Sequence, residues 1–108
     1  MNLLIHGPLL TIISSLYAAL SKIIIVVYYK LGKTVTVTCA ATGGTTPYQY
    51  QVSYKKASTS TYTTVQDYST NKTVTIKPGA ATTYQIRIKV KDKAGKVSTS
   101  VIALNVTK

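Results

Sequence analysis

The chain carries few of the side chains that perform catalysis. It has one histidine, His6, one cysteine, Cys39, and two carboxylates, Asp67 and Asp92, with no glutamate. Nucleophilic and acid–base catalysis require such groups to converge on one point. A Ser-His-Asp arrangement would need His6, close to the N-terminus, to be held against a distant aspartate. The composition therefore predicts a protein without enzymatic activity and without catalytic residues.

The same shortage argues against metal and cofactor sites. One histidine and one cysteine without a carboxylate cluster do not make up a ligand set for zinc or calcium. The segment GGTT at 43–46 lacks the lysine and the following helix of a phosphate-binding loop, so it is typical of a turn. A self-formed Lys–Asn cross-link would need a buried acid, and Asp67 and Asp92 both lie in turn-like sequence. We expect no metal and no cofactor.

Cationic side chains are abundant. Thirteen lysines and arginines against two aspartates give a net charge of +11, and the resulting field attracts polyanions. Because side chains alternate along a strand, the basic residues in TYQIRIKVK share the face opposite its apolar residues. A lysine of the strand YQYQVSYKK falls on the same face of the expected sheet, and two more lie at its rim. The candidate anion-binding face therefore consists of Lys55, Arg87, Lys89, Lys91, Lys93 and Lys96.

Two interpretations of this face remain open. A half-buried sheet needs a solvated side, and lysines also discourage edge-to-edge aggregation. Alternatively, the face binds an anionic glycan, a wall polymer or an acidic protein, which the near absence of acidic residues favours. Nucleic acid is a weaker candidate, because alternation turns most tyrosines inward, away from the cations with which they would act on bases.

The elements that must position this face are strands. At 108 residues the chain has room for one domain and an appendage. After residue 31, six short alternating segments are separated by turn sequences, which predicts a β-sandwich over residues 32–108. The segments are 34–40, 48–56, 62–68, 73–77, 83–91 and 97–106. In the fifth, Tyr84, Ile86, Ile88 and Val90 share the face expected to be buried.

Residues 1–31 differ from the rest in being apolar and almost uncharged. Gly7-Pro8 followed by helical spacing of apolar residues predicts a short amphipathic helix at 8–21, and β-branched residues predict a strand at 23–29. The segment could dock on the domain or on a neighbouring copy, span a membrane, or stay disordered. A membrane span would place Lys22 mid-way, at a cost of about 2.5–3.5 kcal/mol. The leader MNLLIHG lacks the basic residues of a signal peptide.

Three stretches resemble a known class of domain. IKPGAATTYQIRIKVKDKAGKVSTS resembles the strand E to strand G region of fibronectin type III-like domains. PYQYQVSYKKASTSTYTTVQDYSTNKTVTIKP and VTVTCAATGGTTPYQY are similar to strands B to E of immunoglobulin-like repeats in secreted and surface proteins of Gram-positive bacteria. The resemblance covers residues 32–108. It implies an immunoglobulin-like or fibronectin type III-like antiparallel β-sandwich that carries the N-terminal helix and strand as an appendage.

The resemblance also implies a role for Tyr84. It lies near the start of the penultimate strand, two residues before Ile86, where related domains have a tyrosine corner. Its hydroxyl would then hydrogen-bond to the connection that includes Pro78 and Gly79.

Other structural positions follow from the same resemblance. Cys39 occupies the strand B position of the first disulfide cysteine of antibody domains, whereas the matching later position holds Ile86. The core would thus be closed by apolar packing, with Cys39 as a lone buried thiol; pairing between two chains is the alternative. Tyr50 or Tyr54 would take the place of the tryptophan usual on strand C.

The resemblance implies a function only broadly, because these sandwiches serve many purposes. The leading expectation is a non-catalytic binding, adhesion or spacer module of a secreted or cell-surface bacterial protein. The first alternative is a self-assembling oligomer or fibre subunit, in which residues 1–31 complete or cover the sandwich of a neighbour. The second is a membrane-tethered small basic protein or inhibitor.

Overall fold

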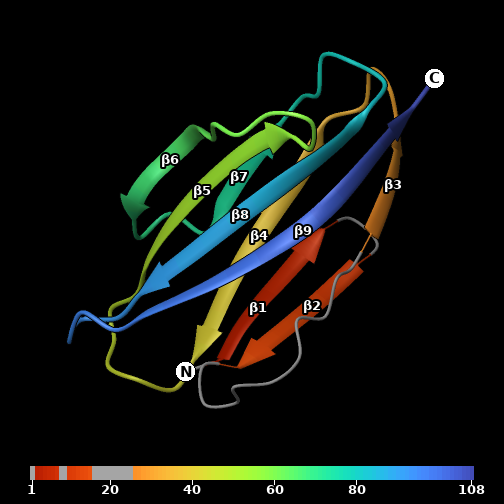
Figure 1. Cartoon of the computed structure of the whole chain (residues 1–108). Helices are drawn as coiled ribbons and strands as arrows, with labels where there is room; N and C mark the ends of the chain where they lie inside the picture. The colour runs from red at the N-terminus through yellow and green to blue at the C-terminus, as the bar shows by residue number, and fades with distance from the viewer. Residues whose placement is uncertain (1, 8–9, 16–25) are drawn as a thin grey trace.

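The computed structural model describes residues 2–7, 10–15 and 26–108, and the side chains of residues 27–108. These residues form an all-β fold of two sheets, consistent with a β-sandwich (Figure 1). One sheet has the order β2-β1-β4-β7 and the other β3-β9-β8-β5-β6. The strands are β1 (Asn2–Gly7), β2 (Leu10–Ser15), β3 (Val26–Lys30), β4 (Val35–Thr42), β5 (Gln49–Lys56), β6 (Thr63–Ser69), β7 (Thr73–Ile76), β8 (Thr83–Lys91) and β9 (Val97–Thr107).

The six strands expected after residue 31 are confirmed as β4 to β9, each within a few residues of the predicted bounds. Their burial alternates as a half-buried strand requires. On β8 the exposed fractions of Tyr84, Ile86, Ile88 and Val90 are 4%, 3%, 0% and 0%, whereas the residues between them are half-buried. The inward and outward faces of this strand are therefore those that its sequence predicts.

The core lies between the two sheets. In Figure 1, β5, β8 and β9 pass in front of β4 and β7. The buried side chains of the two layers belong to one hydrophobic cluster. The four-stranded sheet contributes Val35, Val37 and Cys39 from β4 and Val74 and Ile76 from β7. The five-stranded sheet contributes Tyr50, Val52, Tyr84, Ile86, Ile88, Val90, Ile102, Leu104 and Val106.

The helix predicted at 8–21 is wrong for residues 10–15, which form the strand β2. This strand pairs antiparallel with β1 in an unbroken register from Gly7↔Leu10 to Asn2↔Ser15. The segment LTIISS is rich in β-branched residues, which favour strands. Pairing with β1 satisfies its backbone and outweighs the helical spacing of its apolar residues. Residues 8–9 and 16–21 of the predicted helix lie outside the described residues.

The strand predicted at 23–29 corresponds to β3, which starts at Val26; residues 23–25 lie outside the described residues. β3 runs parallel to β9 at the edge of the five-stranded sheet, with Val27 opposite Leu104. β1 pairs antiparallel with β4, with Ile5 opposite Cys39. The N-terminal strands thus extend both sheets of their own chain. Over the described ranges, the protein has no helix long and apolar enough to cross a bilayer.

Candidate anion-binding face

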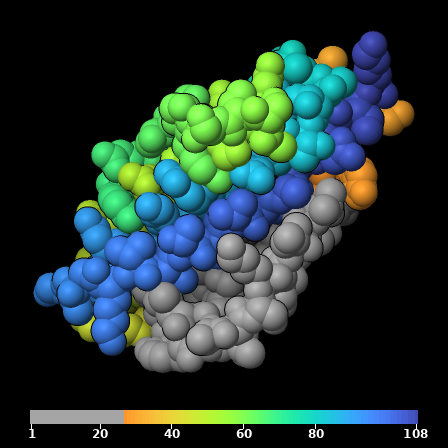
Figure 2. All heavy atoms as spheres, viewed as in Figure 1, coloured from red at the N-terminus to blue at the C-terminus, as the bar shows by residue number. Residues whose placement is uncertain are grey.

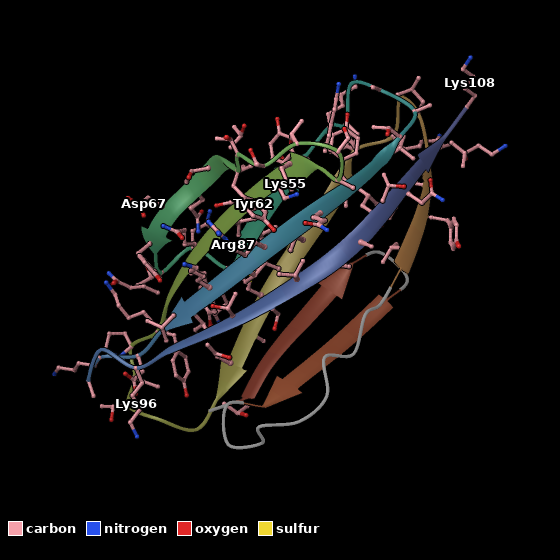
Figure 3. All side chains as sticks on the ribbon, viewed as in Figure 1. Lys55, Tyr62, Asp67, Arg87, Lys96 and Lys108 are labelled. Carbon is pink, nitrogen blue, oxygen red and sulfur yellow. The ribbon has the colours of Figure 1, made fainter. Side chains whose placement is uncertain are left out.

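The candidate face is the outer side of the five-stranded sheet, where β8 lies between β5 and β9. Residues paired across antiparallel strands share a face. Arg87 therefore lies beside Ser53 of β5 and Val101 of β9, and Lys89 lies beside Gln51 and Thr99. Figure 2 views this face directly, with β8 and β9 in blue and the residues of β5 and β6 in green. In Figure 3, Lys55, Tyr62 and Arg87 gather over its centre.

The centre of the face is a cluster of two cations around one aromatic ring. The guanidinium carbon of Arg87 lies 4.0 Å from the centroid of the Tyr62 ring, and the Lys55 Nζ lies 5.5 Å from the same centroid. Both distances allow attraction between a cation and the ring quadrupole. The Tyr62 hydroxyl donates to Oε1 of Gln85 at 3.4 Å, and the Lys55 Nζ donates to the Thr59 carbonyl at 2.7 Å. These contacts hold the cluster over β5 and β8.

Two polar atoms under this cluster have no hydrogen-bond partner among the described residues. They are Oγ of Ser53 and Nε of Arg87, both fully buried. The two residues are partners in the pairing of β5 with β8. Alternation predicted Ser53 on the outer face, and its pairing with Arg87 places it there, yet its exposed fraction is 0%. Buried polar groups usually have hydrogen-bond partners, so two buried polar atoms without any are unusual.

A second cluster lies further along β8. The Lys91 Nζ is 4.3 Å from the centroid of the Tyr68 ring, and Gln51 donates from Nε2 to Oδ1 of Asp67 at 2.9 Å. The hydrogen bond from Gln51 lowers the pKa of Asp67 most, followed by the hydrogen bond from the Tyr68 N–H. Burial opposes this effect, and the Lys91 charge lowers the pKa by a smaller amount. The one carboxylate on this part of the face is thus held in its charged form.

The expectation that tyrosines turn away from the cations is wrong for Tyr62 and Tyr68. Tyr50 and Tyr84 are buried as expected, but Tyr62 and Tyr68 lie against Arg87 and Lys91 on the outer face. The pairing of β5 with β6 shifts register twice, between Tyr50 and Ser53. Such shifts re-aim side chains, so alternation alone does not assign the faces of β6. The sequence around β6 therefore carried no signal that these two tyrosines lie against the cations.

The six candidate residues do not form one cluster. Lys55 and Arg87 meet at Tyr62, Lys89 follows on β8, and Lys91 lies at Tyr68. Lys93 and Lys96 are exposed in the turn between β8 and β9, and Figure 3 places Lys96 at the far end of the sheet from Lys55.

Asp92 lies in a turn-like sequence, where side chains are usually exposed, but its exposed fraction is only 4%. Its Oδ1 accepts from the Lys96 N–H at 2.8 Å and its Oδ2 from the Thr45 N–H at 3.1 Å. Burial by itself raises the pKa of Asp92, but backbone N–H groups of Lys96, Thr45 and Ala94 outweigh it and lower the pKa below 3.8. The carboxylate therefore joins the loop after β4 to the turn after β8.

The loop side of this junction is equally specific. Gly44 has a φ of +62°, and a Cβ added there would lie 2.7 Å from Oδ2 of Asp92. Any larger residue would collide with the carboxylate and would also be strained. Asp92 is thus a structural group, since both its oxygens are already occupied by backbone donors.

We expect Asp92→Asn to lower the melting temperature by about 4–8 °C at neutral pH. In the parent each carboxylate oxygen accepts from a backbone N–H, whereas the asparagine amide would place its own NH2 donor against one of these N–H groups. A folded-state pKa below the unfolded value stabilises the protein above the unfolded pKa, and this contribution is lost as the pH falls through the folded pKa. The difference between variant and parent should therefore shrink below about pH 4. Thermal unfolding of parent and variant at neutral pH and below about pH 4 measures this difference in melting temperature. Asp67→Asn, on an exposed carboxylate, is the matched control; an equal loss there would refute the assignment.

The remaining reactive groups form no site among the described residues. The backbone of His6 lies on β1 opposite Thr38, and its side chain is outside the described part. Among the described residues no three His, Cys, Asp or Glu side chains come together as metal ligands. Tyr84 is buried and packs against Tyr54 with 6.1 Å between ring centroids.

Among the other structural positions, Cys39 is a fully buried free thiol. Its burial raises its pKa to about 12. Burial also raises the pKa of Tyr50, with smaller contributions from Cys39 and Tyr48. Tyr54 is partly buried against the core. We expected the Tyr84 hydroxyl to hydrogen-bond to the Pro78–Gly79 connection, and the described side chains show no such bond. Tyr84 and Gly79 do line the same open hollow.

That hollow adjoins the candidate face at the end of β5. Lys55 lines it together with Tyr54 and the hydroxyl-bearing segment 58–61. The face therefore continues from the Arg87 cluster into an open hollow with both polar and apolar lining.

Comparison with known proteins adds no further assignment: no family model, no curated protein and no solved structure matches this chain.

Proposed function

We propose that this chain is a non-catalytic binding module whose outer face on β5, β6 and β8 holds an anionic partner. The observation that carries the proposal is the arrangement of cations on tyrosine rings. Arg87 lies on Tyr62 and Lys91 on Tyr68, with Lys89 between them on β8. Within the described face only Asp67 offers a negative charge. A solvated sheet face needs polar groups, but it does not need such an excess of cations over carboxylates.

The proposal includes an immunoglobulin-like or fibronectin type III-like sandwich. In support, β1, β4 and β7 are neighbours in one sheet, and β9, β8, β5 and β6 are neighbours in the other. Immunoglobulin-like domains divide their strands in a similar way, with A, B and E in one sheet and G, F and C in the other. By the resemblance of residues 32–108, the module would belong to a secreted or surface-attached bacterial protein and act in adhesion.

The strands near the N-terminus favour a self-contained module over assembly by strand donation. β1 pairs with β4, and β3 pairs with β9, so these strands have partners within the same chain. A full-length protein that stays monomeric in light scattering over a wide concentration range would agree with this. Concentration-dependent growth would instead support the oligomer or fibre.

Removing three charges from β8 tests the binding face. We expect the variant with Arg87→Gln, Lys89→Gln and Lys91→Gln to lose affinity for polyanions on the order of 10-fold or more at low salt. The parent protein should bind more weakly as salt rises, and the variant should show a shallower salt dependence. Calorimetric titrations with heparin and with polygalacturonate at several salt concentrations measure both effects.

The matched control removes the same charge elsewhere. Lys33, Lys72 and Lys77 are exposed, and none belongs to the candidate face. Their combined replacement by Gln should weaken binding far less than the β8 variant does. Equal losses in the two triple variants would show that only the net charge matters, and the outer face would then be an ordinary solvated surface of a spacer.

A further inference from the structure

We propose that Arg87 is the specificity-determining anchor of this face and takes one carboxylate group of an acidic polysaccharide. The inference rests on the proposed function and names the class of its partner. It concerns one side chain with its immediate neighbours Tyr62, Ser53 and Gln85, whereas the proposed function concerns the whole cationic face.

The guanidinium is held in one orientation before any ligand arrives. Its carbon lies 4.0 Å from the centroid of the Tyr62 ring, and that ring is tethered through its hydroxyl to Gln85, two residues before Arg87 on the same face of β8. Arginine presents a planar fork of donors that matches the two oxygens of a carboxylate. A fork fixed in advance loses less conformational entropy on binding than a mobile side chain would.

Among the described side chains, no carboxylate pairs with the charge of Arg87. Its Nε is buried without a hydrogen bond, and the hydroxyl of Ser53 directly opposite is buried without one as well. The carboxylate of Asp67 is bound by Gln51 and the Tyr68 N–H, and the carboxylate of Asp92 by Lys96 and Thr45. Both aspartates are therefore engaged elsewhere, which leaves the charge of Arg87 available to an anionic ligand.

The surroundings of Arg87 favour a polysaccharide over other polyanions. Next to the cations the face presents amides and hydroxyls, which suit the hydroxyl groups of sugars: Gln51, Gln85 and Thr99 on the strands, and Ser58, Thr59, Ser60 and Thr61 in the adjoining hollow. Single-stranded nucleic acid would need aromatic rings on which bases stack. Here Tyr62 and Tyr68 already have a cation against their rings.

Exchanging Arg87 for lysine tests the anchor, because it keeps the charge and removes the fork. With oligogalacturonate as the probe in calorimetry, we expect Arg87→Lys to lose about 10-fold in affinity. The matched control Lys72→Arg, also charge-neutral but at an exposed lysine away from the face, should change the affinity less than about 2-fold. Tyr62→Leu, which keeps apolar bulk but removes the ring, should weaken binding in the same direction as Arg87→Lys. Thermal unfolding of each variant separates a loss of binding from a loss of fold.

The ligands give a second readout that does not depend on any variant. Methyl-esterified oligogalacturonate, which lacks the charge, should not bind. Dextran sulfate, poly-glutamate and oligo-dT of matched charge should bind the parent more weakly than oligogalacturonate. Tighter binding of any of these three would assign the face to sulfated polymers, acidic proteins or nucleic acid and overturn the inference. If Arg87→Lys has no effect while the triple β8 variant loses binding, the anchor fails and the proposed function stands; if no polyanion binds, both fail.

Discussion

Replacing Ile88 with alanine is expected to lower the free energy of unfolding by about 2–5 kcal/mol. Ile88 has an exposed fraction of 0% and lies on β8, the middle strand of the five-stranded sheet. Its neighbours in register are Val52 of β5, also fully buried, and Ser100 of β9. Because the backbones on both sides are held by strand pairing, the surrounding structure has little freedom to close the space that the side chain leaves.

Urea unfolding followed by circular dichroism measures this loss. A small domain is stable by about 5–15 kcal/mol, so the midpoint for Ile88→Ala should fall far below that of the parent with little change in the slope. Ile88→Val should lose only about 0.5–1.5 kcal/mol. Val101→Thr, on an exposed β-branched residue of the neighbouring strand, should stay within about 0.5 kcal/mol. A loss under about 1 kcal/mol for Ile88→Ala would mean that β8 does not form the centre of the core.

The burial of Ile88 was predictable from the sequence because it depends only on local alternation. A strand has a period of two residues, so each apolar residue in TYQIRIKVK fixes the side of its neighbours. The same reasoning gave the outward direction of Arg87, Lys89 and Lys91. It required no knowledge of which strands are neighbours, and so it held wherever a strand pairs regularly on both sides.

Features that depend on pairing between strands were not predictable in this way. The apolar residues of segment 8–21 have helical spacing, yet residues 10–15 form a strand because β1 supplies a partner for their backbone. A spacing pattern records which side chains could be buried together, but not whether another segment is available to pair with. For short apolar segments the two structures compete closely, and the partner decides.

The candidate site was predictable only as a row of charges. The positions of Tyr62 and Tyr68 depend on register shifts between β5 and β6, and turn sequences at 57–61 do not specify them. Likewise, Asp92 is buried because Thr45, 47 residues earlier in the chain, donates to it. These contacts join distant segments, and a single sequence gives no direct signal for such contacts.

Cys39 should react with a thiol reagent at least about 1000-fold more slowly in the native protein than in urea. The reactive species is the thiolate, and a pKa raised from 9.0 to about 12 lowers the thiolate fraction near neutral pH by about three orders of magnitude. The side chain is also fully buried on β4, which lies between β1 and β7. Native Cys39 should therefore react only when the protein opens. Its labelling rate with a chromogenic disulfide, measured in buffer and in urea, tests this, with Thr70→Cys in a Cys39→Ala background as the exposed control.

The labelling rate also distinguishes global from local opening. If Cys39 becomes accessible only on complete unfolding, its rate follows the equilibrium population of the unfolded state. Ile88→Ala should then accelerate labelling by the factor that corresponds to its loss of stability, about 30-fold for 2 kcal/mol. Ile88 lies in the opposite sheet from Cys39, so only cooperative unfolding of both sheets transmits the effect. Equal labelling rates in Ile88→Ala and the parent would show instead that β4 is exposed by separation of β1, independently of the core.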